Sequence, residues 1–200
     1  MKQLRAEGVA TDHLPEMDLT LEAGERLCLS GPSGVGKSLL LRALADLDPH
    51  RGKIWLDDRE QVEIPAVAWR KQVGLLPAES AWWAETVGEH FSEPPAEGLR
   101  QLGFDESTLG WSVERLSSGE KQRLALLRLL ANMPSVLLLD EPTANLDRES
   151  TAKAEALIKD YSQRHQAAVL WVSHDPEQIR RVATRHVRLQ AGKLGEVALS

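Results

Sequence analysis

This sequence has one cysteine, few aromatic residues and no long apolar run, and each shortage excludes a class of protein. Cys28 is the single cysteine in 200 residues, so an internal disulfide and a disulfide-stapled secreted scaffold are excluded. The longest apolar stretch, LALLRLLANM, is interrupted by Arg128 and is too short to cross a bilayer. The first residues, MKQLRAEGVATD, lack the apolar core of a secretory signal. We therefore expect an intracellular protein that does not insert into a membrane unaided.

Basic residues are also in short supply. Lysine and arginine number 24 against 30 aspartates and glutamates, which gives a formal net charge of −6. A surplus of positive charge is what binds a phosphate backbone, so no direct contact with nucleic acid is expected. A hydrophobic content of 42% over 200 residues suits one well-buried domain and is too little for two. The sequence predicts a single domain over residues 1–200.

Short apolar runs alternate with helical patterns along the chain, which predicts an α/β fold with a mostly parallel core sheet. The predicted core strands are RLCLSG (26–31), VGLLPA (73–78), VLLLDE (136–141) and AVLWVSH (168–174). The predicted helices are SLLLRALADL (38–47), EKQRLALLRLLANM (120–133) and TAKAEALIKDYSQRH (151–165). KIWLDD (53–58) and HVRLQAGKL (186–194) are interpreted as added strands, the latter turning through Ala-Gly. Residues 81–133, which are poor in strand signals, are interpreted as an inserted helical subdomain.

The segment GPSGVGKS, Gly31–Ser38, matches the phosphate loop G-x-x-x-x-G-K-[ST] between a predicted strand and a predicted helix. Glycines let backbone N–H groups surround phosphates, Lys37 reaches the β- and γ-phosphates, and the Ser38 hydroxyl is a Mg²⁺ ligand. A glycine-rich turn with an incidental lysine is the alternative. The predicted ATP-binding residues are Gly31, Pro32, Ser33, Gly34, Val35, Gly36, Lys37, Ser38 and Leu39.

Two carboxylates end the apolar run VLLLDE. The carboxyl edge of a parallel sheet is where ligands of open α/β folds bind. Asp140 is predicted to hold Mg²⁺ through its water shell, and Glu141 to orient and deprotonate an attacking water. Taken alone, the pattern is explained equally well by a strand that leaves the core with an acidic end.

The stretch LSSGEKQR, residues 116–123, has two interpretations. Ser117 followed three residues later by Glu120 is a capping box before a helix. The same Ser-Ser-Gly turn offers hydroxyls, backbone N–H groups and a helix N-terminus to a phosphate. Within one chain this corner is expected to lie away from the phosphate loop. If two chains face each other head to tail, each corner can cap the γ-phosphate bound by the other chain.

The ordered set GPSGVGKS, LSSGEKQR, VLLLDEPT, ANLD and WVSHD resembles the nucleotide-binding subunit of ATP-binding cassette (ABC) proteins over essentially the whole chain. The resemblance implies a P-loop fold of ABC type and an ATPase that uses ATP and Mg²⁺. It implies catalytic roles for Glu141 and His174, and metal binding by Ser38 and Asp140. It also implies a signature that contacts the ATP of a second copy, and a D-loop Asp147 at the dimer interface; Asp147 is equally a helix N-cap. The signature residues are Ser117, Ser118, Gly119 and Glu120.

Two positions depart from the family pattern. The family carries a glutamine after the strand seen here as VGLLP, and Ala78 occupies that position, so the relay must use Glu79, a bridging water or a group outside this sequence. The family also stacks adenine on an aromatic residue upstream of the phosphate loop, whereas residues 1–30 contain no Phe, Tyr or Trp. His13 is the candidate substitute.

The resemblance further implies an integral membrane permease as partner and a position at the cytoplasmic inner face of the cell membrane. Trp82 and Trp83 follow the substituted loop; adjacent residues cannot share one face, so one of them is a candidate exposed hot spot for that partner, and packing of both within the subdomain is the alternative. Compactness and the motif pattern look most like bacterial cassettes of FetA/YbbL type, which suggests metal, particularly iron, export. The alternative is a soluble ABC ATPase acting on nucleic acid, ribosomes or iron–sulfur assembly. A P-loop kinase or GTPase would leave LSSGE and His174 unexplained.

Overall fold

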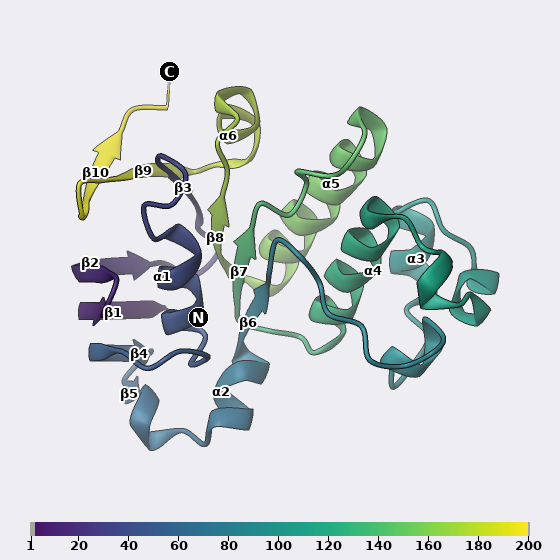
Figure 1. Cartoon of the computed structure of the whole chain (residues 1–200), viewed down its shortest axis with the longest axis horizontal. Helices are drawn as coiled ribbons and strands as arrows, with labels where there is room; N and C mark the ends of the chain where they lie inside the picture. Colours follow the sequence, from purple (N-terminus) through teal and green to yellow (C-terminus); the bar gives the residue numbers. More distant parts are fainter. Residues whose placement is uncertain (1–2, 200) are drawn as a thin grey trace.

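The computed structural model describes residues 3–199, and its core is a six-stranded sheet in the order β10-β9-β3-β8-β7-β6 (Figure 1). All neighbouring strands in it are parallel except β10, which pairs antiparallel with β9. The expected mostly parallel core is confirmed. The strands are β3 (Arg26–Ser30), β6 (Val73–Leu76), β7 (Val136–Asp140), β8 (Ala168–Val172), β9 (Arg185–Gln190) and β10 (Lys193–Val197).

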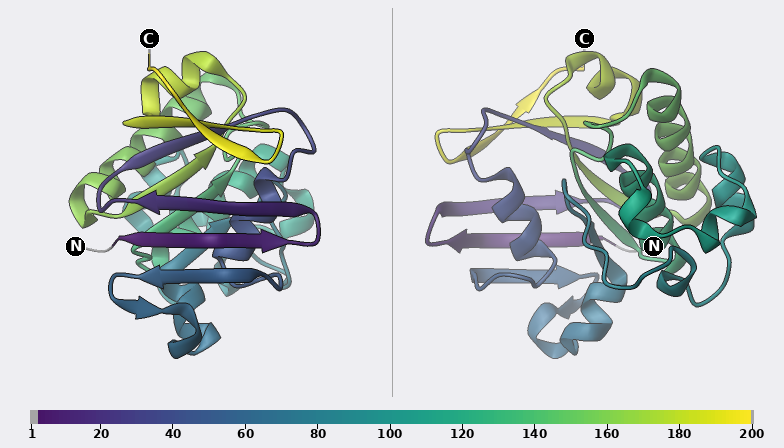
Figure 2. Two further views of the ribbon diagram at one scale, coloured as in Figure 1. Left: turned by 90° about the vertical axis from the view of Figure 1, so that its left-hand side faces the viewer. Right: turned by 45° about the vertical axis from the view of Figure 1, so that its right-hand side comes forward.

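A second, antiparallel sheet has the order β2-β1-β4-β5 and is seen face-on in the left view of Figure 2. The predicted strand KIWLDD belongs to this sheet. The sequence pattern did not reveal β1 or β2, because the pairing register shifts between Ala6 and Val9 and the alternation of buried and exposed residues is broken there. The strands are β1 (Leu4–Thr11), β2 (Leu14–Leu21), β4 (Arg51–Leu56) and β5 (Arg59–Glu60).

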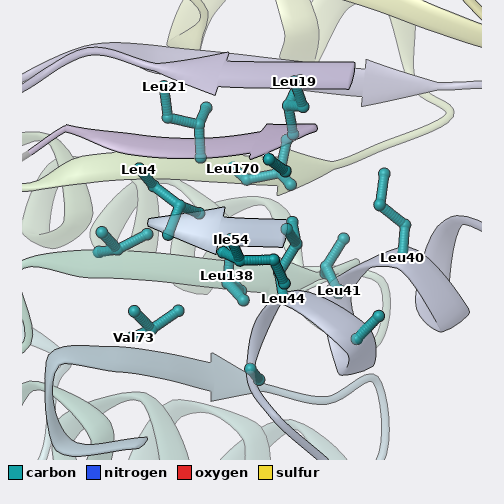
Figure 3. Packing of buried hydrophobic residues seen from close by; sticks show 14 of the residues in the cluster. Leu4, Leu19, Leu21, Leu40, Leu41, Leu44, Ile54, Val73, Leu138 and Leu170 are labelled. Carbon is teal, nitrogen blue, oxygen red and sulfur yellow. The ribbon is translucent and has the colours of Figure 1, made fainter. Parts of the chain in front are cut away.

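Helices cover both faces of the core sheet. On one face α1 (Lys37–Leu44) packs between the two sheets, where Leu40, Leu41 and Leu44 meet leucines of both (Figure 3). On the other face α4 (Ser118–Ala131) and α5 (Arg148–His165) form a second apolar cluster with β7 and β8. The short helices are α2 (Ala66–Gln72), α3 (Ala96–Gln101) and α6 (Pro176–Val182). Within residues 3–199 no helix is long and apolar enough to span a membrane.

Between β6 and α4 the chain makes only short helical pieces and one isolated bridge, Thr86 to Ser112. This stretch, which lies with α4 at one end of the molecule in Figure 1, falls within the residues assigned from sequence to a helical subdomain. Its pieces are η2 (Gly88–His90), α3, η3 (Glu106–Gly110) and η4 (Val113–Arg115). Pro94 and Pro95 precede α3 and interrupt any longer helix.

Candidate active site

The loop after β3 is shaped by three glycines with left-handed backbone conformations. Gly31, Gly34 and Gly36 have φ angles of 150°, 74° and 105°, which other residues rarely adopt. A side chain at Gly31 would also collide with the backbone oxygen of Leu189. The chain can therefore turn tightly from the carboxyl end of β3 into α1. Among the other predicted loop residues, Pro32 and Ser33 are exposed, whereas Val35 and Leu39 are partly buried.

Lys37 begins α1, and its ammonium group is held over the loop. Its Nζ donates hydrogen bonds to the backbone oxygens of Gly31 and Pro32, both at 2.9 Å. The residue before it, Gly36, offers no side chain to cap the first-turn N–H groups of α1. Free backbone N–H groups, a helix N-terminus and an ammonium group together form a cradle suited to phosphate.

Asp140, the last residue of β7, lies buried beside the first turn of α1 and is hydrogen-bonded to Ser38. Burial raises the pKa of the Asp140 carboxyl, and the nearby Glu141 carboxylate acts in the same direction. The Ser38 hydrogen bond and the Lys37 ammonium oppose that rise. A hydroxyl and a carboxylate beside a phosphate cradle are the protein ligands that Mg²⁺ accepts when substrate phosphates complete its shell.

Glu141 and His174 meet beside this pair. Their strands β7 and β8 are parallel neighbours, with Asp140 opposite Val172, so both residues emerge at the same sheet edge. The His174 Nδ1 atom lies 3.5 Å from Oε1 of Glu141, and the His174 side chain is 72% exposed. Glu141 has a φ of 47°, a conformation that non-glycine residues adopt mostly where the surrounding structure demands it.

A buried polar network supports this edge, and sequence reasoning missed it. Gln178 of α6 donates to the Thr143 hydroxyl at 2.7 Å and to the Glu155 carboxylate at 2.9 Å. The Ser173 hydroxyl donates to Oε1 of Gln178 at 2.9 Å. The network joins the segments after Glu141 and before His174. Its only sequence signal is a glutamine on a short helix, and such residues are usually exposed.

The predicted capping box at the start of α4 is formed. The backbone N–H and the hydroxyl of Ser117 donate to the Glu120 carboxylate at 2.8 and 2.7 Å, and the Glu120 N–H donates to the Ser117 hydroxyl at 3.2 Å. The hydroxyl bond, reinforced by the backbone bond, lowers the pKa of Glu120. Ser117 and Ser118 remain exposed at this corner.

The same corner packs against the turn that contains Asp147. A Cβ atom at Gly119 would lie 3.0 Å from the backbone oxygen of Asn145, so only glycine fits without a shift. Asp147 caps α5 by accepting bonds from the N–H and hydroxyl of Ser150 at 2.9 and 2.8 Å. These two bonds, led by the backbone bond, lower the pKa of Asp147.

The two corners stand on different sides of the core sheet. The phosphate loop leads into α1, which belongs to one apolar cluster, whereas Ser117 leads into α4, which belongs to the other (Figure 1). The structure therefore brings Lys37, Ser38, Asp140, Glu141 and His174 to one sheet edge. It brings the signature residues next to Asp147 instead.

The loop with the unusual alanine is connected to α4 through its backbone. Ala78 and Glu79 are exposed just after β6. The buried Gln122 of α4 donates from Nε2 to the backbone oxygen of Pro77 at 3.1 Å. This bond links the signature helix to the loop independently of the side chain at Ala78.

His13 is exposed in the turn between β1 and β2, and that turn lies against the phosphate loop. An ideal Cβ at Gly36 would be 2.6 Å from Cδ1 of Leu14 and 4.0 Å from the backbone oxygen of His13. The position suits a base-stacking residue, and that role for His13 stays a prediction.

Trp82 and Trp83 have the predicted unequal exposure: Trp82 is partly buried and Trp83 is 72% exposed. The Arg128 guanidinium lies 4.6 Å from the ring centres of both. His90 contacts both rings edge-on and accepts the backbone N–H groups of Trp83 and Ala84 at 3.1 and 3.2 Å. Trp83 and Arg128 line a groove of 400 Å³ between β6 and α4.

Comparison with known proteins supports one family. The family model described as ABC transporter matches residues 14–144. The chain is 36% identical over 188 residues to aliphatic sulfonates import ATP-binding protein SsuB 2 of Frankia alni, covering 92% of this chain and 73% of that protein. It is 33% identical over 198 residues to the probable iron export ATP-binding protein FetA of Escherichia coli, covering 92% and 88%.

Solved structures share the fold. An ATP-bound bacterial Atm1-family ABC exporter aligns with a TM-score of 0.86 and 23% identity over 97% of this chain and 38% of that one. A dimeric ATP-binding cassette in a post-hydrolysis state, bound to ADP and Pi, aligns with a TM-score of 0.79 and 24% identity over 98% and 99%. At 23% and 24% identity, the structural similarity establishes a shared fold and nothing further.

Proposed function

This chain belongs to the ATP-binding family of ABC transporters and is an ATPase; from that premise we propose that it dimerises head to tail around two Mg-ATP molecules and drives a separate membrane permease. The observation that carries the proposal is the division of the phosphate-binding groups. Lys37 and Glu141 lie at one sheet edge, whereas Ser117 lies with α4, which packs on the opposite face from α1. One chain thus holds two half-sites, and a second copy supplies the missing half of each.

In the proposed site the phosphate loop and Lys37 bind the β- and γ-phosphates. The Lys37 ammonium exchanges the carbonyls of Gly31 and Pro32 for phosphate oxygens, which are stronger partners because they are charged. The N–H groups of the glycine-rich turn complete the cradle. Stabilisation is electrostatic and requires little movement, since the donors are already positioned.

The residues fit Mg²⁺, which Ser38 would bind directly and Asp140 through water. No group of three or more His, Cys, Asp or Glu side chains within residues 3–199 is placed to bind a metal by itself. That absence suits Mg²⁺, which uses one or two protein ligands together with nucleotide phosphates. The ion would supply charge neutralisation on those phosphates.

Glu141 is proposed to orient the attacking water and accept its proton, and His174 to contact the γ-phosphate. The 3.5 Å separation of their side chains leaves both able to reach one water or phosphate oxygen. Gln178, through Thr143 and Ser173, positions the segments that carry them. The partner's signature, Ser117–Glu120, would cap the γ-phosphate from the other side, with Asp147 beside it.

The proposed permease contact is the groove lined by Trp83 and Arg128, at the cytoplasmic face of the membrane. An exposed indole on a charged guanidinium is the composition of an interface hot spot. For cargo, we favour metal export of the iron type, supported by the similarity to the relative named for iron export, which is 33% identical over 198 residues; sulfonate import, the activity named for a relative that is 36% identical over 188 residues, is the alternative. The cargo itself is selected by the permease.

A trapped dimer tests this function. Glu141→Gln keeps the site's shape and removes the base, so it should run as a dimer with Mg-ATP and as a monomer with Mg-ADP, measured by size-exclusion chromatography with light scattering. Adding Lys37→Ala to the same variant provides the control, because it removes phosphate binding and should remain monomeric. A monomer of Glu141→Gln at saturating Mg-ATP would contradict the proposal.

Co-purification tests the partner. Native chain recovered from detergent-solubilised membranes should bring an integral membrane protein in comparable amount. Recovery with only soluble proteins or nucleic acid would instead support the soluble ABC ATPase.

A further inference from the structure

A pocket of 360 Å³ lies between β9, α6 and the start of the phosphate loop, and its lining residues from β9 and α6 have no role in the proposed function. Ser30, Gly31 and Pro32 form one wall, His174 another, and Ile179 an apolar part of the lining. The pocket therefore borders both the loop expected to hold the γ-phosphate and the histidine expected to contact it. It opens on the carboxyl side of the parallel strands, where ligands of such sheets bind.

Strand β9 directs two polar side chains into this pocket. His186 and Arg188 are two residues apart and share a sheet face, whereas Val187 and Leu189 point into the apolar core. His186 is fixed by a 2.8 Å hydrogen bond to the Ser30 hydroxyl. Arg188 pairs with Ser30 in the β3–β9 register, which places it level with the start of the phosphate loop.

Arg188 and Arg180, which reaches the pocket from α6, lack carboxylate partners among the described residues. Their sequence neighbours differ: Arg181 pairs with Glu155 at 2.9 Å, and Arg185 pairs with Glu25 at 2.9 Å.

Two of the nearby acidic groups are engaged elsewhere, and Glu177 on α6 is exposed and forms no ion pair with Arg180. Glu196 pairs with Arg185 at 3.3 Å, and the Asp175 carboxylate accepts the Glu177 N–H at the start of α6. The pocket is consequently lined by two exposed guanidinium groups that have no ion-pair partner among the described residues. Guanidinium groups bind tetrahedral oxyanions with paired, charge-assisted hydrogen bonds.

We infer that this pocket binds orthophosphate, with Arg180 and Arg188 as its ligands, and receives the phosphate produced by ATP hydrolysis. The inference rests on the proposed role of Gly31–Ser38 and His174 at the γ-phosphate. Attack of water breaks the bond between the γ-phosphorus and the oxygen of the ADP leaving group, and the pocket acts after that step. Phosphate moves past His174 and Pro32 into the arginine pair, away from the bound ADP.

Direct binding of inorganic phosphate tests the inference. Isothermal titration calorimetry is performed with saturating ADP on the wild type, on Arg180→Gln/Arg188→Gln, and on Arg100→Gln/Arg164→Gln. The last variant loses the same charge at two arginines that are 65% and 62% exposed and lie outside the pocket. Phosphate affinity should fall about tenfold or more in the pocket variant, since two charge-assisted bonds are lost, and stay unchanged in the control.

Equal phosphate affinity in the wild type and both variants would overturn the inference. ATPase assays of the wild type separate it from the proposed function. If the wild type hydrolyses ATP but its phosphate affinity does not depend on the two arginines, the pocket is not the phosphate site, and the proposed ATPase function still stands. If phosphate binding depends on the two arginines but the wild type does not hydrolyse ATP, the phosphate site is supported and the proposed catalytic role is contradicted. The same arginine loss should weaken product inhibition by phosphate while leaving ATP affinity unchanged.

Discussion

At the scale of single residues, Asp140 shows how a binding site is built at a cost to the protein's own stability. Its carboxyl is buried next to Glu141, and burial raises its pKa. A raised pKa in the folded chain means that the ionised form is less favourable there than in the unfolded chain. Its contribution to stability is therefore largest at low pH and is lost as pH rises through the folded pKa.

Asp140→Asn should accordingly stabilise the nucleotide-free protein at pH about 7, and its advantage in melting temperature over the wild type should narrow as the pH falls through the folded pKa of Asp140 toward the unfolded value of about 3.9. Mg-ATP should raise the melting temperature of the wild type and have little effect on the variant. Thermal unfolding at several pH values measures both. A nucleotide-free variant less stable than the wild type at neutral pH would contradict this account.

Trp83 is the residue at which the proposed partner contact can be tested separately from folding. Trp83→Ala should lower the free energy of unfolding by only about 1 kcal/mol, because this exposed indole loses little beyond its ring contacts with Arg128 and His90. Trp82→Ala, which removes packing against the second apolar cluster, should lose about 2 kcal/mol or more. Urea unfolding gives these values.

Permease recovery gives the second readout for Trp83→Ala, which should bind the membrane partner more weakly. Unchanged partner affinity at unchanged stability would remove Trp83 from the interface.

The site residues that could be predicted from sequence are those that belong to a local sequence motif. Lys37 and Asp140 stand at fixed offsets from glycines or strand ends, so their convergence at one edge follows from parallel topology. Gln178 and Arg188 could not be found in this way. The environment of each includes segments far away along the chain, such as Glu155 on α5 for Gln178 and Ser30 on β3 for Arg188.

At the scale of elements, local signals located the start of α4 and the buried core strands, but not the β1–β2 hairpin. The capping box placed the start of α4 at Ser117, and the described structure has its N-cap there. The buried strands were predicted to within two residues because their apolar runs are continuous. The β1–β2 hairpin was missed because its irregular register hides the alternation that identifies a half-buried strand.

The capping box gives a pH-dependent prediction for α4. Ser117→Ala should lower the free energy of unfolding by about 1 kcal/mol. The lowered pKa of Glu120 means that its carboxylate stabilises the fold above its unfolded pKa, and that this stabilisation disappears as pH falls through the lowered folded value.

Glu120→Gln should therefore be less stable than the wild type at neutral pH and approach it below about pH 4. Chemical denaturation across pH measures the difference. A stability gap that is constant with pH would show that the carboxylate charge has no part in the cap.

At the scale of the whole molecule, the two corners proposed to bind phosphate lead into helices on opposite faces of one sheet. Such a chain cannot enclose one nucleotide with both corners, whereas a head-to-tail pair can do so twice. Hydrolysis then depends on dimer closure, which is how ATP binding can be converted into movement of a partner.

Mixing two inactive variants tests this central claim most directly. Lys37→Ala removes phosphate binding but keeps the signature, and Ser118→Asp keeps the phosphate loop but places a negative charge against the partner's phosphate. Aspartate at the first turn of α4 favours the helix, so folding is preserved. Each variant alone should be inactive.

ATPase activity is measured for each variant alone and for their equimolar mixture. A mixed dimer contains one composite site made of the intact loop from one chain and the intact signature from the other, so activity should reappear on mixing. If the mixture stays as inactive as its components while both variants remain folded and mixed dimers form, the two corners do not serve one nucleotide across the interface.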